Sequence, residues 1–557
     1  MKHKIIAGFA SAAVLAAVLA AFPVSFKSLE MKKVHAPGGE VSSREELCEA
    51  LGGEEAMLAD SLCLKTDIIL DSPLVIAAGD YVLTGAGCTV TKGFAEGDMM
   101  VIKAGASLRL GDKKHVGDYA DITLSGNVIS RSDENGAAMR EAEEPLFDPA
   151  ESDGAMLAVE GGTLAVMPGA VLQNGYSKRS GGCIRLEGGE VLFDGGSILG
   201  CGTAGNGGGV NIAAGSTFRM LSGSIADCYA AERGGGLYAE GTAELAGGIV
   251  SGSAAKQGGG LYAASAVSFA EFALSENRAE QGGGVYIAAD MEASGCSAVQ
   301  NTAEQGGGIY NAAVLGINGM NIYKNSAASG AGVYNAGTLT LSAGYFSENA
   351  ASGQGGGIFN REDGVCTWTG GTLASNSAEA GGGIMNLGTL VQSGGTYLVN
   401  KAKAGTALCN LGYLTFSGSV CISDIASVML VPGSGEGQGI IRVEGKLTAE
   451  TVAVIVPGKA ENGVLSEDYD SAAPFLTGSR EDVRDASGKV KVKAYGDQKY
   501  ALKADGTLKR VHELPKNPIV WLLIGGITVL AAGALSFFLI RKKKKLSARA
   551  EEASSQH

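Results

Sequence analysis

The sequence is poor in the residues that catalytic and metal sites most often use. None of its five histidines lies between residues 181 and 410, and they are His3, His35, His115, His512 and His557. There are two tryptophans, no CxxC pair, and no HExxH, P-loop or Ser-His-Asp pattern. We therefore predict no catalytic residue, no cofactor-binding residue, no metal ligand and no cofactor.

Proline and net positive charge are also scarce. The chain has 87 glycines but only 11 prolines, and the glycines alternate with Ile, Val, Leu and Tyr, which argues against collagen and against a flexible linker. The net charge of −14 argues against nucleic acid as a partner. Calcium-binding GGxGxDxUx repeats are excluded as well, because no glycine run is followed by the required Asp.

What the chain has instead is a glycine repeat. Glycine runs recur at intervals of 24 to 27 residues, and they begin at residues 181, 207, 234, 258, 282, 306, 330, 355, 381 and 405. A fixed period of this size is typical of a solenoid. In GAGVYNAGTLTLSAGYFSEN, residues 330–349, the segment Thr338–Leu341 alternates with period two, and no 3.6-residue period is present. Short strands between Gly, Asn and Ser turns predict the coils of a parallel β-helix, about 24 residues each.

Each coil repeats the same residue types in the same columns. An aliphatic column follows the glycines and predicts a continuous core: Leu237, Leu261, Val285, Ile309, Val333, Ile358 and Ile384. Two Asn columns predict amide hydrogen bonds from coil to coil: Asn277, Asn301, Asn325, Asn349, Asn376 and Asn400, and Asn311, Asn335, Asn360, Asn386 and Asn410. A side chain in the glycine turns, for example at Gly307, would either meet the next coil or block a positive φ.

A tyrosine column follows the aliphatic one. Its members are Tyr238, Tyr262, Tyr286, Tyr310 and Tyr334, with Phe359 and Met385 in continuation. Strand alternation predicts that these side chains face outward. Two interpretations remain open: a stripe that binds a glycan or a peptide, or a packed ladder that stiffens the coils.

These motifs resemble a known family. GGGIY, with the FSEN of Phe346–Asn349 and its variants, resembles the GGA[ILV] and FxxN repeats of the chlamydial polymorphic outer membrane proteins, over about residues 181–410. The resemblance implies a right-handed parallel β-helix and a role in adhesion. Those proteins are autotransporters, whereas this chain ends in a hydrophobic segment and a lysine cluster, so only the passenger repeats are comparable.

Both ends of the chain indicate a membrane. Residues 1–25 have the pattern of a signal peptide, with an uncleaved signal anchor as the alternative. Residues 519–540 predict a transmembrane helix and residues 541–557 a cytoplasmic basic tail. Leu514–Pro518 resembles a sortase signal in which Asn and Pro replace Thr and Gly. We expect a single-pass protein of the cell membrane with an extracellular ectodomain, as on a Gram-positive-type surface.

The rest of the chain divides around the repeat. Residues 36–130 predict an N-terminal cap and first coils, with a short helix after Ser43, and residues 131–153 an acidic inserted loop. The β-helix with glycine repeats spans residues 154–410, and residues 411–513 predict irregular final coils and a membrane-proximal cap that includes a terminal strand pair.

The ten cysteines are an even number in a chain predicted to be exported. Most are scattered singly through the apolar repeat, which favours buried small side chains over disulfides. Cys48, Cys63 and Cys88 lie closer together in the cap, and a bridge is expected there in preference.

These observations predict a non-catalytic, adhesin-like surface protein. Its expected partners are the membrane and a host glycan or surface protein. Two alternatives stay open: a carbohydrate-active β-helix enzyme of the lyase or glycoside hydrolase kind, and a passive structural stalk or coat. A groove that gathers at least two carboxylates with a Lys or Arg would favour the enzyme.

Overall fold

The computed structural model describes residues 39–51, 60–85, 87–111, 121–126, 153–422, 427–431, 438–449, 452–461, 464–467, 474–494 and 498–511. The chain divides into two units, Met1–Phe359 and Asn360–His557. The predicted signal peptide, nearly all of the acidic loop, the sortase-like segment and the predicted transmembrane helix lie outside the described residues. Within the described ranges, no helix has the length and apolar character needed to cross a membrane.

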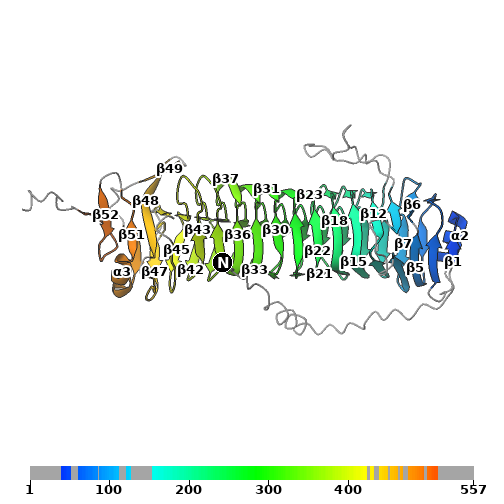
Figure 1. Cartoon of the computed structure of the whole chain (residues 1–557), viewed down its shortest axis with the longest axis horizontal. Coiled ribbons are helices and arrows are strands. Elements are labelled where there is room, and N and C mark those ends of the chain that lie inside the picture. The colour runs from blue at the N-terminus through cyan, green and yellow to red at the C-terminus, as the bar shows by residue number, and fades with distance from the viewer. Residues whose placement is uncertain are drawn as a thin grey trace, which may run out of the picture. The chain divides into compact units, whose positions relative to one another are not determined.

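Met1–Phe359 is a parallel β-solenoid of the right-handed type, as the repeat predicts. Successive coils stack on one another (Figure 1), and every coil contributes to sheets that run along the stack. The first sheet of this unit contains β1 (Gly39–Val41), β2 (Asp60–Leu64), β3 (Ile68–Leu70), β5 (Gly79–Gly85), β6 (Cys88–Lys92), β8 (Ala106–Leu110), β9 (Ile122–Ser125), β11 (Thr163–Val166), β12 (Ala170–Gln173), β15 (Glu190–Leu199), β18 (Thr217–Ala226), β21 (Thr242–Leu245), β22 (Gly248–Ser251), β25 (Val267–Phe269), β26 (Phe272–Ser275), β29 (Met291–Ser294), β30 (Ser297–Val299), β33 (Val314–Tyr323) and β36 (Thr338–Ser347).

Two further sheets complete the coils of this unit. The second sheet contains β4 (Leu74–Ile76), β7 (Met100–Lys103), β10 (Leu157–Glu160), β14 (Ile184–Glu187), β17 (Val210–Ile212), β20 (Leu237–Ala239), β24 (Leu261–Ala263), β28 (Val285–Ile287), β32 (Ile309–Asn311) and β35 (Val333–Asn335). The third contains β13 (Tyr176–Ser177), β16 (Gly202–Thr203), β19 (Tyr229–Ala230), β23 (Ala254–Gln257), β27 (Arg278–Gln281), β31 (Thr302–Gln305), β34 (Ser326–Ser329) and β37 (Ala350–Gln354).

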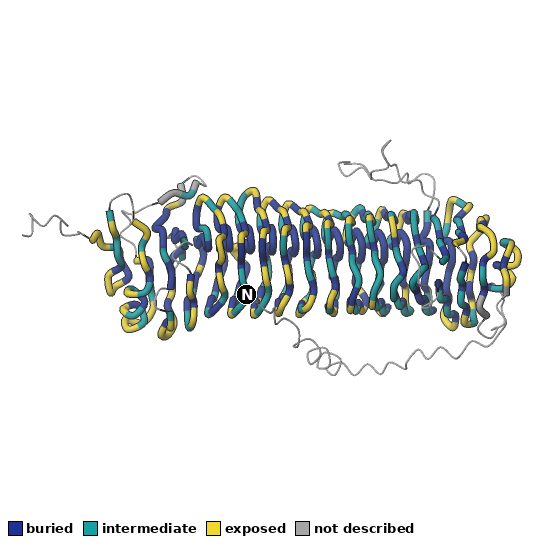
Figure 2. Tube along the Cα trace, viewed as in Figure 1, coloured by how far each residue is buried: buried dark blue, intermediate teal, exposed yellow. Residues whose placement is uncertain are grey.

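The core is the aliphatic column that the sequence predicts. Ile309 lies opposite Val333 in parallel register, and both are buried, as is every other member of the column. Buried residues alternate with more exposed ones along most strands of the first sheet, whereas strands of the second sheet such as β32 and β35 are buried throughout. Buried segments recur from coil to coil in Figure 2. Equivalent residues superpose because parallel strands of successive coils pair without a shift over most of this unit, at a spacing of about 4.8 Å.

The glycine turns are explained by two different constraints. Gly306, the first of its run, has φ +69°, a conformation that L-residues rarely adopt. Gly307 lacks a positive φ, but a Cβ there would lie 2.6 Å from the Ser326 carbonyl oxygen and 2.7 Å from that of Ala331. The first glycine therefore makes the turn, and the second lets the backbones of successive coils approach closely.

The Asn columns form the predicted ladders. The Asn301 side-chain amide donates to Asn325 Oδ1 at 3.0 Å, and that of Asn325 donates to Asn349 Oδ1 at 2.9 Å. The same oxygens accept the backbone N–H of the preceding Asn, and each amide also donates to a backbone carbonyl, such as that of Ala298. These buried amides are thus bonded on several sides, which makes the corner rigid without leaving polar groups unsatisfied.

The first coil carries the predicted helical cap. Helix α2 (Arg44–Leu51) begins after Ser43, whose Oγ accepts the Glu46 backbone N–H at 3.2 Å. Leu47 and Leu51 are fully buried. The helix therefore covers apolar surface at the start of the solenoid, as the sequence predicts.

The described part of Asn360–His557 has the same parallel construction. One sheet contains β41 (Ile384–Asn386), β44 (Leu408–Asn410), β46 (Ser427–Leu430), β48 (Ala453–Glu461) and β51 (Val490–Val492). The other contains β39 (Val365–Trp368), β40 (Thr372–Ala374), β42 (Thr389–Gln392), β43 (Thr396–Leu398), β45 (Tyr413–Phe416), β47 (Ile441–Val443) and β50 (Leu476–Gly478). Strand β38 (Ile358–Asn360) contains the boundary between the units.

The later part of this unit departs from the repeat. Strand β49 (Val464–Glu467) pairs antiparallel with β48, and the short helix α3 (Arg480–Ser487) is capped by Ser479. The predicted terminal strand pair is the antiparallel hairpin of β52 (Lys499–Leu502) and β53 (Leu508–Val511).

All ten cysteines are free thiols. Those of the repeat are buried, as predicted: Cys183, Cys201, Cys228, Cys296, Cys366 and Cys409. Cys421 is exposed. The expectation of a bridge among Cys48, Cys63 and Cys88 is wrong, because the last two stand in different columns, opposite Thr84 and Ile122 respectively.

Val399, which directly follows strand β43, has a strained backbone conformation. Its φ is +53°, and its side chain is 69% exposed, so packing offsets none of the strain. We expect Val399→Asn to raise the free energy of unfolding by about 1 kcal/mol, because Asn tolerates this conformation and valine does not. Asn174 already holds such a φ, at +59°. Thermal denaturation measures the change.

The matched control for this prediction is Val365→Asn. Val365 is also exposed, at 38%, but it lies in the extended strand β39. We expect no stabilisation there. Equal melting temperatures for the Val399→Asn variant and the unmodified protein would contradict the strain.

Candidate functional site

The tyrosine column stands on the second sheet as a stacked ladder. Ring centroids of successive tyrosines are 4.8 to 5.5 Å apart, with interplanar angles of 8 to 15°, and Phe359 continues the stack at 4.9 Å from Tyr334. Tyr262, Tyr310 and Tyr334 are each 8% exposed. The faces of the inner rings are covered by their neighbours, so they are not free to stack on a sugar.

The Tyr286 hydroxyl, in the middle of the ladder, is also partly shielded from water. Burial raises the pKa of the Tyr286 hydroxyl to about 12, and the neighbouring Tyr310 and Tyr262 hydroxyls add to the rise. Of the two interpretations of this column, the geometry favours the packed ladder. A recognition surface, if the chain has one, must use other residues.

A second ladder, made of glutamine side chains, lies at the edge of the third sheet. The Gln257 amide donates to Gln281 Oε1 at 2.8 Å, and the Gln281 amide donates to Gln305 Oε1 at 3.0 Å. Arg233 Nε donates to Gln257 Oε1 at 3.2 Å and so begins the series. The Arg233 guanidinium also lies over the Tyr262 ring, 5.2 Å from its centroid. We call Gln257, Gln281 and Gln305 the amide ladder.

The amide ladder forms the floor of a shallow surface depression of about 330 Å³. Four consecutive coils each contribute two neighbouring residues to it, and the lining consists of Glu232, Arg233, Lys256, Gln257, Glu280, Gln281, Glu304 and Gln305. The glutamines are half-buried, whereas Lys256, Glu280 and Glu304 are exposed. All eight side chains are polar or charged, which suits a ligand that presents many hydrogen-bonding groups.

The charges of this depression are unevenly paired. Lys256 forms an ion pair with Glu232 at 2.9 Å. The register of β27 and β31 places Glu280 beside Glu304 on adjacent coils, and neither forms an ion pair within the described part of the chain. Carboxylates outnumber the two cations, so the local field favours neutral or positively charged ligands over anions.

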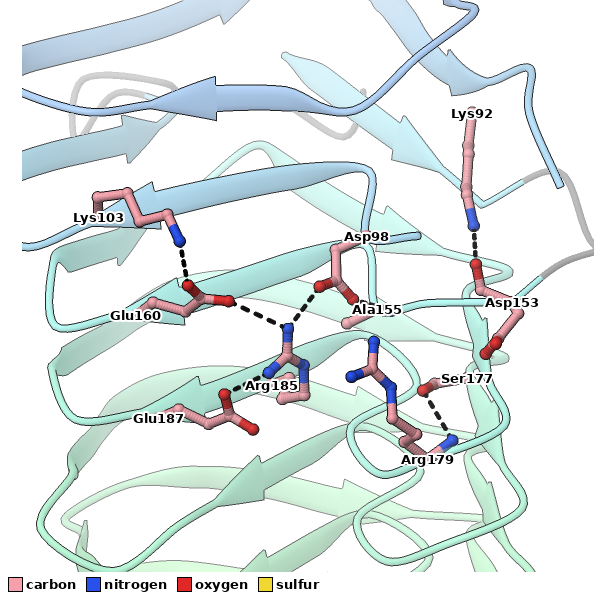
Figure 3. A network of polar contacts seen from close by, with 10 residues as sticks. All are labelled: Lys92, Asp98, Lys103, Asp153, Ala155, Glu160, Ser177, Arg179, Arg185 and Glu187. Atoms are coloured by element: carbon pink, nitrogen blue, oxygen red, sulfur yellow. Dashed lines mark hydrogen bonds and ion pairs between the residues drawn. The ribbon is translucent and has the colours of Figure 1, made fainter. Parts of the chain in front are cut away.

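A separate polar network lies on the outer side of the second sheet, around Arg185 (Figure 3). The Arg185 guanidinium binds Asp98 and Glu187, and it also reaches Glu160 at 3.4 Å. Asp98 accepts the Ala155 backbone N–H at 2.8 Å. Lys103 binds Glu160 from the neighbouring coil. The network thereby joins residues that precede the predicted acidic loop to residues that follow it.

The network holds Arg185 and Glu160 in their charged forms. Burial alone would lower the pKa of Arg185, but the hydrogen bond to Glu187 and the adjacent Asp98 raise it above its usual value. The hydrogen bond from Lys103 lowers the pKa of Glu160. A general acid at neutral pH needs the opposite shift, so this arrangement favours a structural clamp over acid catalysis.

Sequence reasoning predicted the tyrosine column but missed both polar sites. The amide ladder had a visible signal, because Gln281 and Gln305 each precede a glycine run in EQGGGVY and EQGGGIY. The Arg185 network had a weaker one. Lys103, Glu160 and Glu187 stand in one column of the second sheet, but Arg185 occupies another column and Asp98 precedes the strand β7. In the described ranges no group of His, Cys, Asp and Glu is arranged to hold a metal ion.

Comparisons of the chain with protein-family models, curated proteins and solved structures found no match. The chlamydial resemblance therefore rests on the repeat motifs alone. The parallel β-solenoid that it implies is present, while the adhesive role stays a prediction.

Proposed function

We propose that this chain is an adhesin-like protein of the cell surface, held by a C-terminal membrane anchor, which presents a rigid β-helix to a ligand. The observation that carries the proposal is the depression over the amide ladder. A passive stalk needs only a stiff scaffold, and the tyrosine and Asn ladders supply that stiffness. The depression adds a concave, polar surface on which the exposed carboxylates of Glu280 and Glu304 form no ion pair among the described residues.

The rigidity of the scaffold supports binding. The lining residues belong to β23, β27 and β31 or directly precede a glycine turn, and backbone hydrogen bonds fix these strands from coil to coil. Side chains on such a surface lose little additional freedom when a ligand arrives, which lowers the entropic cost of association. A repeated surface also allows several weak contacts to act together.

The second candidate is a carbohydrate-active enzyme, and one observation favours it. The depression brings three glutamates together with Lys256 and Arg233. A groove with at least two carboxylates and a Lys or Arg is the arrangement that would favour an enzyme. Glu280 and Glu304 stand side by side, as the two carboxylates of a retaining glycosidase would. Both are exposed, however, whereas the general acid of such a pair is typically held in an apolar pocket.

The proposal is tested with the full chain, purified in detergent, on an array of glycans and matrix proteins. We expect saturable binding to at least one component and no release of reducing ends from any bound polysaccharide. Binding that is accompanied by cleavage would support the enzyme instead. The complete absence of binding would leave the stalk as the function.

A further inference from the structure

We infer that the amide ladder is a binding site for a neutral, hydroxyl-rich glycan chain that lies along the direction in which the coils stack. This inference deepens the proposed function by naming the ligand class and the residues that meet it. The site consists of Gln257, Gln281 and Gln305 with the flanking side chains of the depression.

The amide ladder leaves part of its hydrogen-bonding capacity unused. A glutamine amide has two N–H donors and an oxygen that accepts twice. Gln281 uses one N–H for Gln305 and one acceptor position for Gln257, so one donor and one acceptor remain. Gln257 likewise has one donor and one acceptor left, because it accepts from Arg233 and donates to Gln281. The NH₂ group of Gln305 has no acceptor among the described residues. A hydroxyl group both donates and accepts, and pairs of sugar hydroxyls therefore match these amides.

The amides of the ladder are regularly spaced along the stack of coils. Equivalent amides recur once per coil, about 4.8 Å apart. A glycan chain presents hydroxyl groups on every sugar ring and along both edges of the chain, so it can offer a hydroxyl to each amide of the ladder. An extended peptide advances about 3.3 Å per residue and points its backbone groups alternately to either side, so its amides fall out of register with the ladder. The four coils of the depression would accommodate a short run of sugar units.

The surroundings of the ladder carry negative charge. Glu280 and Glu304 lie beside the ladder without an ion-pair partner in the described structure, and Lys256 is held by Glu232. An anionic polysaccharide would meet these carboxylates and a chain with a net charge of −14. Glycans rich in carboxylate or sulfate are thus disfavoured. The aromatic platform common in sugar sites is replaced here by amide contacts, because the Tyr262 ring is stacked between Tyr238 and Tyr286.

The experiment uses the full chain in detergent and measures its affinity for a neutral β-glucan, an anionic polygalacturonate and a cationic chitosan. The test variant is Gln257→Met/Gln281→Met/Gln305→Met, which keeps side-chain length and removes the amides. The matched control is Gln354→Met, on the same sheet but outside the depression. We expect the unmodified protein and the control to bind the β-glucan alike, and the triple variant to bind it at least tenfold more weakly.

Other outcomes overturn the inference in distinguishable ways. If some ligand binds but the triple variant is unaffected, the ladder is not the site and the proposed function stands. If only chitosan binds, and Glu280→Gln/Glu304→Gln abolishes this, the site is a charge site and not an amide site. If none of the three polysaccharides binds, the inference fails, and the array of glycans and matrix proteins decides the proposed function separately.

A second variant covers the case in which the triple variant unfolds. Glu304 is exposed, and Glu304→Trp places a large ring over the ladder without altering buried residues. We expect this variant to melt like the unmodified protein and to lose β-glucan binding at least tenfold. Unchanged binding in a folded Glu304→Trp variant would overturn the inference as well.

Discussion

Gly307→Val is expected to lower the free energy of unfolding by about 3 kcal/mol, a large effect for one exchange in a chain of many glycines. The new Cβ would lie 2.6 and 2.7 Å from two backbone carbonyl oxygens of the next coil. Those carbonyls cannot withdraw easily, because Gly308 and Ile309 donate hydrogen bonds to the same coil at 2.9 and 3.0 Å. The shift of the urea midpoint, followed by circular dichroism, measures the loss.

The control for this prediction is Gly488→Val. Gly488 also has a negative φ, but the nearest atom to its added Cβ is the Asp485 carbonyl oxygen at 3.7 Å, an ordinary contact. We expect a change of at most about 1 kcal/mol there. If the Gly307→Val protein unfolded at the same urea concentration as the control, the close approach of coils at the glycine turns would be refuted.

Arg185→Leu is expected to destabilise the protein by about 3 to 5 kcal/mol. The substitution removes the guanidinium from Asp98, whose side chain is 9% exposed, and leaves it with the hydrogen bond from the Ala155 N–H and the charge of Lys92. In the unmodified protein, the attraction between Arg185 and Asp98 offsets the free energy of removing both ions from water. Without Arg185, the cost of burying the Asp98 carboxylate lowers the free energy of unfolding. Thermal and urea denaturation of the variant measure the effect.

The companion variant separates charge from packing. Arg185→Leu/Asp98→Asn removes both charges, so we expect it to recover a substantial part of the lost stability. Lys403→Ala breaks an ion pair whose side chains are 79% and 55% exposed, and we expect no measurable shift from it. A double variant no more stable than Arg185→Leu would show that the network does not act through charge pairing.

The repetitive part of the fold was predictable because stacking converts a sequence period into a spatial column. Asn301, Asn325 and Asn349 recur every 24 residues, and a parallel coil of that length can only place them above one another. The same reasoning predicted the buried aliphatic column and the glycine turns. It could not assign the two reasons for glycine to Gly306 and Gly307, because both constraints select the same residue type.

The candidate site was less predictable. Alternation gives the outward direction of Tyr286, but it does not reveal that rings on adjacent coils stack and cover one another. The amide ladder has the period of the repeat. Its glutamines directly precede the glycine runs, and the glycines alone were interpreted as the feature of that segment. The partners of Arg185 come from both sides of the predicted acidic loop, and no spacing in the sequence links them.

The most direct test of the account is the affinity of the full chain for a neutral β-glucan, measured for the unmodified protein and for Gln257→Met/Gln281→Met/Gln305→Met. The account predicts saturable binding that weakens at least tenfold in the triple variant while the melting temperature is retained. Equal affinity of the two folded proteins, or no affinity in either, would contradict the claim that the depression recognises a glycan.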